Sequence, residues 1–369
     1  MANEFLSIKN IARQALPRLM ENLVFPNLIY KDYSDAFEVG KGATVQVRKP
    51  VVLTASDFDS GSGTSAQDVK ETSVEVTLDK LATVDVEFGA IARATSVDDL
   101  NRLFIEPAAA ALATKINDDG LKLVFDIPYG VGTAGTTPDG LDDFANAAKV
   151  LDDNKAPTTQ RYGVWDPTAM SKFRQIGDLV NAEKSGATAA LRAGSIGNVF
   201  GIQNYMSQGV AKTGSSTGAG TIKVDNSGGY AAGTKLIHVD GVTTALAAGA
   251  KLKIKNGYYT VASVGDLSTA DQDITLSQGL IESVSDNDDV AIVSATSVNN
   301  VVFHTNAFAF VTRPLAAPAG VESYTTSYNG ISLRVVRGYN MQYKKETLSM
   351  DVLYGYKTMY PELAVRVLG

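Results

Sequence analysis

The residues of this chain that could carry out chemistry are few and far apart. The sequence contains 2 histidines, His238 and His304, and each lies in a run that alternates apolar and polar residues as a strand does. It contains no cysteine, which excludes thiolate nucleophiles, disulfides and cysteine metal sites. We therefore expect both histidines to be structural strand positions.

Three further motifs suggest chemistry and lack the context for it. The run DNDD at 286–289 could suggest calcium, but it has neither the spacing nor the glycine of an EF-hand loop, so we expect a solvated turn. The run SGSGTS at 60–65 precedes no helix, and LRAGSIG at 191–197 places its glycines before a strand, the wrong order for a phosphate-binding loop. The sequence thus predicts no catalytic residue, no cofactor-binding residue or cofactor, no metal ligand and no enzyme.

Composition excludes further classes of protein. The 369 residues carry a net charge of -7 without a dense Lys/Arg cluster, which argues against a basic nucleic-acid groove. No run approaches the ~18 apolar residues of a membrane span. The opening residues MANEFLSIKN lack the apolar core of a signal peptide, so we expect the protein to stay in the compartment where it is made.

Two helices are predicted in the first third of the chain. Residues 5–24 have apolar side chains at helical spacing, and Pro17 should kink or divide this helix. It is either an ordinary amphipathic helix or an arm that packs on another subunit. Residues 96–126 also read as helix, capped by Thr95 or Ser96, with Pro107 as the first residue of a second segment. Its alanine run provides little bulk, which favours a thin rod over a helix central to a thick core.

A long hairpin is predicted between these helices. The outgoing arm is 44–58, and in the return arm, 74–88, apolar and polar residues alternate with period two. A polar, glycine-rich tip joins the arms. Because an isolated ribbon is only marginally stable, its apolar face must lie on something. The alternative is two strands of an internal sheet.

The remaining chain reads as an α/β region interrupted by an all-β insertion. Residues 139–210 contain two helices, the second capped by Asp166, and a strand that stops at Pro167. From 212 to 297 there is no Arg, Pro, Met, Phe or Trp, and short alternating runs are separated by turn signals. The earlier composition returns after 300 in a strand-rich end.

This order of parts resembles the Hong Kong 97-type fold of tailed-phage major capsid proteins. The stretches that carry the resemblance are EPAAAALATKINDDG, LRAGSIGNVFGIQNYMS, AFAFVTRPLAAPAG, GISLRVVRGYN and MDVLYGYKTMYPELAVRV. They look most like the branch of phage P-twenty-two, whose axial domain carries an inserted β-barrel-like domain.

The resemblance implies an α+β fold with an N-terminal arm, an E-loop hairpin, a long spine helix, an axial α/β domain and an inserted all-β barrel-like domain. The expected divisions are an N-terminal arm (1–40), the E-loop hairpin with peripheral strands (41–94), the spine helix (95–130), a first axial part (131–211), the inserted β domain (212–297), and axial and peripheral strands to the C-terminus (298–369).

The implied function is that of a structural protein. The resemblance implies a major capsid protein that would self-assemble through hexamers and pentamers into an icosahedral shell of the virion around double-stranded DNA, in the bacterial host cytoplasm. The resemblance also implies a separate scaffolding protein, a portal, DNA on the inner face without sequence-specific binding, and no membrane. Crosslinking through Lys49, Lys70 or Lys80, as in some relatives, is not expected. The alternative is a phage tail or surface adhesin, because the insertion also resembles Ig-like modules.

Overall fold

The computed structural model describes residues 8–31, 44–48, 73–89, 105–181, 194–214, 216, 219–265, 271–293, 295–318, 320–340 and 345–369. These residues form an α+β structure in which strands predominate, and they divide into two compact units. Unit 1 comprises Met1–Leu19, Lys31–Leu112 and Ala309–Met359, and unit 2 comprises Met20–Tyr30, Ala113–Phe308 and Tyr360–Gly369.

Unit 1 is built on an antiparallel sheet of long strands. Its order is β16-β19-β18-β17, and β3 pairs with β19 along the edge opposite β18. Opposite residues Arg334 and Asp351 form a largely buried ion pair with Nη2 and Oδ2 2.5 Å apart, which ties β18 to β19. The strands are β3 (Lys80–Gly89), β16 (Phe308–Arg313), β17 (Glu322–Tyr328), β18 (Ile331–Asn340) and β19 (Lys345–Thr358).

The predicted hairpin is present at its base. Strands β1 (Thr44–Arg48) and β2 (Ser73–Thr77) pair antiparallel, with Val45 opposite Val76. The predicted return arm is not one strand, because Leu78 and Asp79 separate β2 from β3, which joins the large sheet. The alternation nevertheless continues across this break: Val76, Leu78 and Ala82 are buried, whereas Leu81 is exposed. The rest of the predicted outgoing arm, 49–58, and the tip, 59–72, lie outside the described residues.

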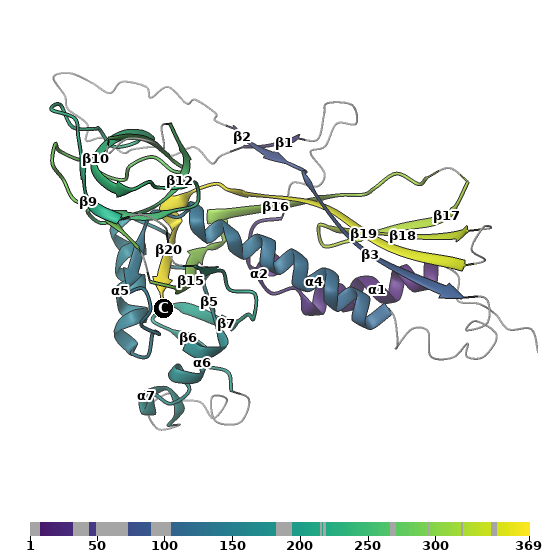
Figure 1. Ribbon diagram of the computed structural model, residues 1–369. Coiled ribbons are helices and arrows are strands. Elements are labelled where there is room, and N and C mark those ends of the chain that lie inside the picture. The colour runs from purple at the N-terminus through teal and green to yellow at the C-terminus, as the bar shows by residue number, and fades with distance from the viewer. Residues whose placement is uncertain are drawn as a thin grey trace, which may run out of the picture. The chain divides into compact units, whose positions relative to one another are not determined.

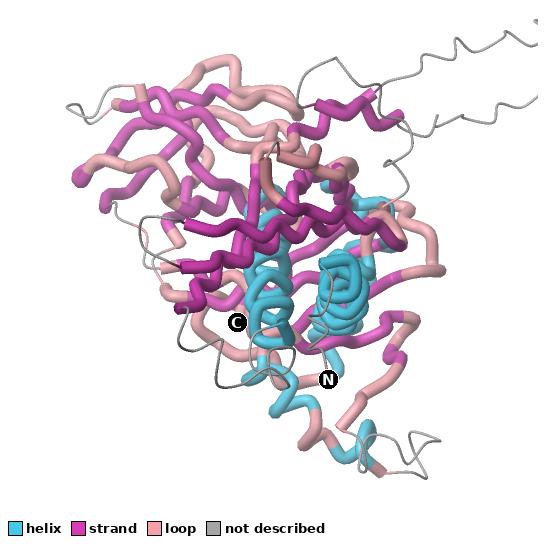
Figure 2. Tube along the Cα trace, turned by 90° about the vertical axis from the view of Figure 1, so that its right-hand side faces the viewer, coloured by secondary structure: helices cyan, strands magenta, loops and turns pink. Residues whose placement is uncertain are grey.

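Helices α1 (Ile8–Asn22) and α4 (Glu106–Leu121) run side by side (Figure 2). An Arg18–Glu106 ion pair of 3.3 Å and a hydrogen bond from the Asn117 amide to the Asn22 carbonyl join them. The expected division at Pro17 is wrong, because α1 continues through it. Proline removes one hydrogen bond and its ring crowds the carbonyl four residues earlier, but the bonds of the flanking turns hold the helix together.

Helix α4 begins one residue before Pro107, so this proline lies in the first turn, where its missing N–H costs nothing. The predicted segment at 95–104 lies outside the described residues. Ala108, Ala109 and Ala113 are buried and Ala111 is exposed, so the small side chains form the packed face of the helix. Leu112 and Ile116 continue that face.

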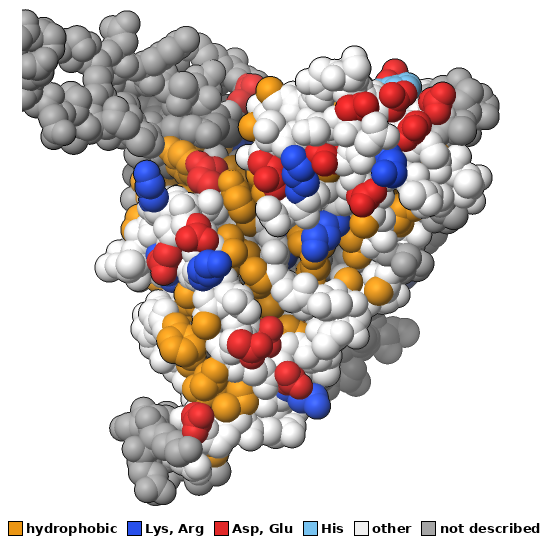
Figure 3. Space-filling view, turned by 90° about the vertical axis from the view of Figure 1, so that its left-hand side faces the viewer, with side chains coloured by type: hydrophobic (Ala, Val, Ile, Leu, Met, Phe, Trp, Pro, Cys, Tyr) orange, Lys and Arg blue, Asp and Glu red, His pale blue; other side chains and the backbone are white. Residues whose placement is uncertain are grey.

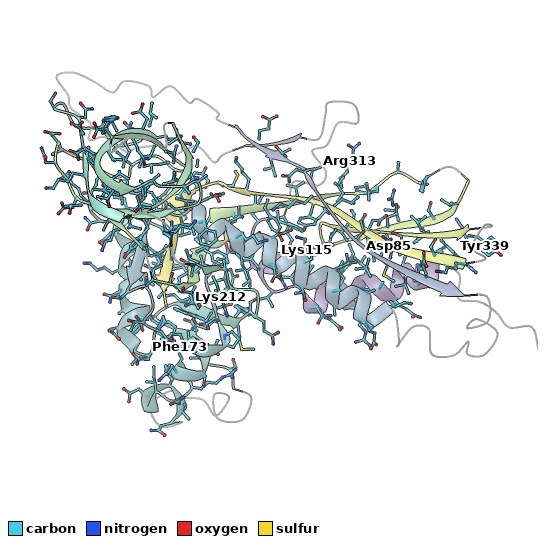
Figure 4. The ribbon with its side chains drawn as sticks, viewed as in Figure 1. Asp85, Lys115, Phe173, Lys212, Arg313 and Tyr339 are labelled. Carbon is cyan, nitrogen blue, oxygen red and sulfur yellow. The ribbon has the colours of Figure 1, made fainter. Side chains whose placement is uncertain are left out.

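Unit 2 contains a mixed sheet with one face packed against helices α5 (Leu141–Asp153) and α6 (Pro167–Phe173) (Figure 1). Its order is β4-β20-β15-β5-β7-β6, with β8 paired to β15. Phe144, Trp165 and Phe173 form an aromatic core under the helices, with the Phe144 and Phe173 ring centroids 4.5 Å apart (Figure 4). The strands are β4 (Gly130–Gly132), β5 (Arg161–Trp165), β6 (Asn198–Val199), β7 (Ile202–Met206), β8 (Lys212–Thr213), β15 (Ser297–His304) and β20 (Ala364–Leu368).

The predicted helix starts of this region are confirmed. Helix α5 (Leu141–Asp153) has Asp142 and Asp143 in its first turn, where carboxylates interact favourably with the positive end of the helix dipole. The Asp166 carboxylate caps α6 (Pro167–Phe173) by accepting from the Thr168 and Ala169 amides. The shorter helices are α2 (Phe25–Leu28), α7 (Gly177–Val180), η2 (Lys122–Asp126), η3 (Thr305–Ala307) and η4 (Pro361–Leu363).

Between β8 and β15 the chain forms a separate antiparallel sheet of order β14-β11-β12-β13-β10-β9. Its edge strands meet, because Val224 donates its amide to the Asp288 carbonyl and a bridge joins Lys223 to Asp289. The sheet encloses its own core of branched aliphatic side chains around Tyr259. The strands are β9 (Ala219–Val224), β10 (Leu236–Thr244), β11 (Lys251–Ile254), β12 (Gly257–Val264), β13 (Gln272–Leu276) and β14 (Val290–Ile292). We call it the inserted sheet.

Candidate interaction surfaces

The structure places the two histidines on different sheets. His238, on β10, is partly exposed, with Nδ1 2.7 Å from Asp273 and Nε2 3.7 Å from Asp225. Figure 3 shows a histidine side chain beside several acidic side chains on one face of the molecule. The hydrogen bond to Asp273 raises the pKa of His238 above its usual value. His304, on β15, is buried and accepts a hydrogen bond from the Asn306 amide, and its burial, with nearby Arg161, lowers its pKa. The two therefore do not share a site.

The acidic run 286–289 forms a turn in which each carboxylate has its own contact. Asp288 accepts a hydrogen bond from the Ser285 amide and lies 3.0 Å from Lys255. The hydrogen bond, and then Lys255, lower the pKa of Asp288. Asp286 accepts from the Asn226 amide, and Asp289 lies 3.6 Å from Lys223. Within the described part of the chain, no three acidic, histidine or cysteine side chains are grouped to hold a metal ion.

The glycines on either side of β6 act in backbone turns. Gly194, Gly197 and Gly201 have φ values of 66°, 71° and 80°, which favour glycine. The run SGSGTS lies outside the described residues. Of the lysines weighed for crosslinking, Lys80 lies with Nζ 5.9 Å from the centre of the Tyr356 ring, and Lys49 and Lys70 are outside the described residues.

Large apolar side chains are exposed at several strand ends. In unit 1, Tyr328 and Tyr339 are 68% and 56% exposed, at the two ends of the β17–β18 pair (Figure 4). In unit 2, Phe200 is 56% exposed in the turn between β6 and β7, close in sequence to exposed Tyr205 and Met206. These positions are candidates for contact with another protein surface.

Phe200 is unusual in a second respect. Its φ of 49° lies in the left-handed region, where an aromatic L-residue is strained. Asparagine or glycine would adopt this turn conformation with less strain. Exposure and a left-handed conformation together make Phe200 a candidate for contact with another protein surface.

Sequence reasoning missed a cluster of buried cations where the inserted sheet meets the rest of unit 2. Arg366, on β20, is 2% exposed and Lys251, on β11, is 9% exposed. The signal available was the arginine inside the apolar run ELAVRVLG, since an apolar strand rarely holds a charge unless it has buried partners.

We compared this chain with known proteins. No family model matches it, and no curated protein is similar to it in sequence. Solved structures are similar. A chain of the structure titled Mycobacterium phage Che8 matches with a TM-score of 0.52 and 20% identity, over 94% of this chain and 90% of that one. A chain of the capsid structure of the cyanophage P-SCSP1u matches with a TM-score of 0.53 and 13% identity, over 94% and 87%. The chain has a phage capsid fold. At these identities the likeness establishes the fold alone.

In the part of the chain that the structure describes, no helix is long and apolar enough to span a membrane.

Proposed function

We propose that this chain is the major capsid protein of a tailed phage, a structural subunit and not an enzyme. The observation that carries the proposal is a fold match that extends over 94% of the chain to a capsid structure. A match of that extent leaves little of the chain for another architecture. Exposed aromatic side chains at strand ends of both units support the proposal, because copies of one chain could cover them in a shell.

The finer assignment follows the Hong Kong 97-type plan. We assign β1 and β2 to the base of the E-loop, α4 to the spine helix, the mixed sheet of unit 2 to the axial domain, and the inserted sheet to the barrel-like insertion of the P-twenty-two branch. The pairing of β8 with β15 supports an insertion, since the chain leaves and re-enters the mixed sheet at adjacent points. The domain limits stated above remain part of this proposal.

The partners belong to the proposal as well. Copies of the chain would form hexamers and pentamers of an icosahedral shell, built in the host cytoplasm with a scaffolding protein and a portal. Double-stranded DNA would fill the shell. The net charge of -7, without a dense cluster of Lys and Arg, argues against a basic groove that binds DNA tightly, so the enclosed DNA would be held without sequence-specific contacts.

The deciding experiment is assembly of the purified chain. The protein is concentrated and examined by sedimentation velocity and negative-stain microscopy. We expect closed shells, or open sheets and spirals of the same subunit. Monomers or trimers at every concentration, with no larger species, would contradict the capsid assignment and favour an adhesin.

A further inference from the structure

One buried side chain, Arg366, bonds both to the inserted sheet and to the rest of unit 2. The Arg366 guanidinium donates from Nε to the Ile127 carbonyl at 2.7 Å and from Nη2 to the Tyr258 carbonyl at 3.0 Å. Ile127 follows η2, and Tyr258 lies on β12 of the inserted sheet. Arginine suits this position because its planar guanidinium presents several donors in fixed directions.

Backbone contacts surround this side chain. The Tyr258 amide donates to the Pro128 carbonyl at 2.7 Å, and the Arg366 amide donates to the Tyr129 carbonyl at 2.9 Å. A Cβ on Gly130 would lie 2.6 Å from the Tyr258 ring, so glycine is needed for this approach. The contact is therefore continuous and close-packed.

A second cation lies in the same contact. Lys251 Nζ is 4.0 Å from the centre of the Phe125 ring and 2.9 Å from Thr260 Oγ1. The Thr260 hydroxyl in turn donates to the Phe125 carbonyl at 3.3 Å. Lys251 and Thr260 belong to the inserted sheet and Phe125 to η2. The contact of Lys251 with the Phe125 ring and the hydrogen bond from Thr260 to Phe125 therefore cross the same boundary.

We infer that Arg366 is a positioning residue that clamps the inserted sheet to the mixed sheet in one orientation, so that the insertion is a rigid part of the subunit. The two chain connections, through β8 and β15, would by themselves permit a swinging motion. The side chain from the last strand removes this freedom, because its two acceptors belong to the two parts being joined. The inference concerns the single chain and holds whether or not the chain forms shells.

The test is a distance distribution between two spin labels. The sequence contains no cysteine, so labels can be introduced at Lys149→Cys on α5 and Lys235→Cys before β10, both exposed in the structure. In the otherwise wild-type chain, pulsed electron paramagnetic resonance should give one narrow distribution of distances between the two labels.

The variant Arg366→Met, placed in this labelled chain, should broaden the distribution and speed hydrogen exchange of the Tyr258 amide by about tenfold or more. The matched control is Arg161→Met. Arg161 is also buried in the mixed sheet, but among the described residues its guanidinium bonds local groups, the carbonyls of Ala156 and Pro157 and the Asp152 carboxylate. The control should lower stability and leave the distribution narrow.

A distribution of wild-type width in Arg366→Met would overturn the inference, and so would equal broadening in Arg161→Met. If Arg366→Met does not fold, Arg366→Lys carries the test, because a lysine fills the space and reaches only one of the two carbonyls. It should also broaden the distribution, and a wild-type width in it would overturn the inference equally.

Discussion

At the scale of single residues, this fold buries several cations and gives each of them at least one neutral oxygen as a hydrogen-bond acceptor. Arg366 and Arg161 donate to backbone carbonyls, and Lys251 donates to a threonine hydroxyl. Burying a charge is costly unless its hydrogen-bonding capacity is met. The stability of the fold should therefore respond to pH changes that alter the charge of such groups, and to substitutions that remove them.

Lys251 should make stability depend on alkaline pH. Burial, with nearby Arg366, lowers its pKa from 10.5 to about 8, so between these values the unfolded chain binds a proton that the folded chain does not. Stability contributed by this group therefore rises with pH over that window, by on the order of 3 kcal/mol at most. Urea unfolding at pH 7 to 10.5 should show that the free energy of unfolding of wild type, minus that of Lys251→Met, becomes more positive as pH rises. A constant difference would contradict the burial of the charge.

His238 should act in the opposite direction. Its pKa is raised, first by the hydrogen bond to Asp273 and further by Asp225 and Asp271, so its contribution to stability is full below the unfolded value of about 6.5 and is lost as pH rises through the folded pKa. His238→Gln should therefore melt below wild type at acidic pH and approach it under alkaline conditions. Because the side chain is partly exposed, the effect should be small.

Phe200 permits a test in which folding and assembly change in opposite directions. Asparagine accepts the left-handed conformation, so Phe200→Asn should raise the stability of the free subunit, by ~1 kcal/mol or less. If Phe200 lies at an interface between copies, the same substitution should reduce the yield of shells. Melting temperature and particle yield by sedimentation are measured together. Shells at wild-type yield would show that Phe200 contributes nothing to assembly.

At the scale of elements, α4 shows how small side chains serve a packed helix. Ala109 and Ala113 are each 1% exposed, whereas Ala111 faces solvent and Ala110 is intermediate. Alanine has the best helix propensity, and its small volume lets a neighbouring element approach closely. The alanine run thus stabilises the helix and its packing together.

Ala109→Leu should therefore lower the free energy of unfolding by ~1–3 kcal/mol through overpacking. Ala111→Leu, two residues away on the exposed face, makes the same chemical change and should stay within ~0.5 kcal/mol of wild type. Equal effects in urea unfolding would contradict the assignment of the packed face.

At the scale of the whole molecule, the inserted sheet has a core of its own inside a larger unit. Its buried aliphatic residues are contributed from within 222–290. A sheet with a closed set of edges and a separate core meets the usual requirements for independent folding.

We therefore expect residues 212–297, expressed alone, to melt cooperatively as a β domain. The melting temperature should lie below that of the full chain, because Arg366 and Phe125 are then missing from the contact. Circular dichroism with temperature is the measurement. A random-coil spectrum without a transition would show that the insertion depends on the rest of unit 2.

Much of the secondary structure could be predicted because its signals are local. The Asp166 cap, the acidic first turn of α5 and the alternation through β2 and β3 each depend on residues within a few positions of one another. The change of composition between 212 and 297 likewise indicated a separate β region before any contact was known. Alternation could not show that the return arm breaks at Leu78 and Asp79, because the apolar side chains keep the same parity across the break.

The contacts that join the parts were decided by tertiary structure alone. His238 meets Asp273 because β10 pairs with β13, and Arg366 reaches Ile127 and Tyr258, which are 239 and 108 residues away in sequence. Nothing in the neighbourhood of Arg366 names these partners. Local sequence sets the conformation of each segment, but a buried charge is satisfied only when distant backbone carbonyls are brought to it, and that is determined by which strands pair and in which register.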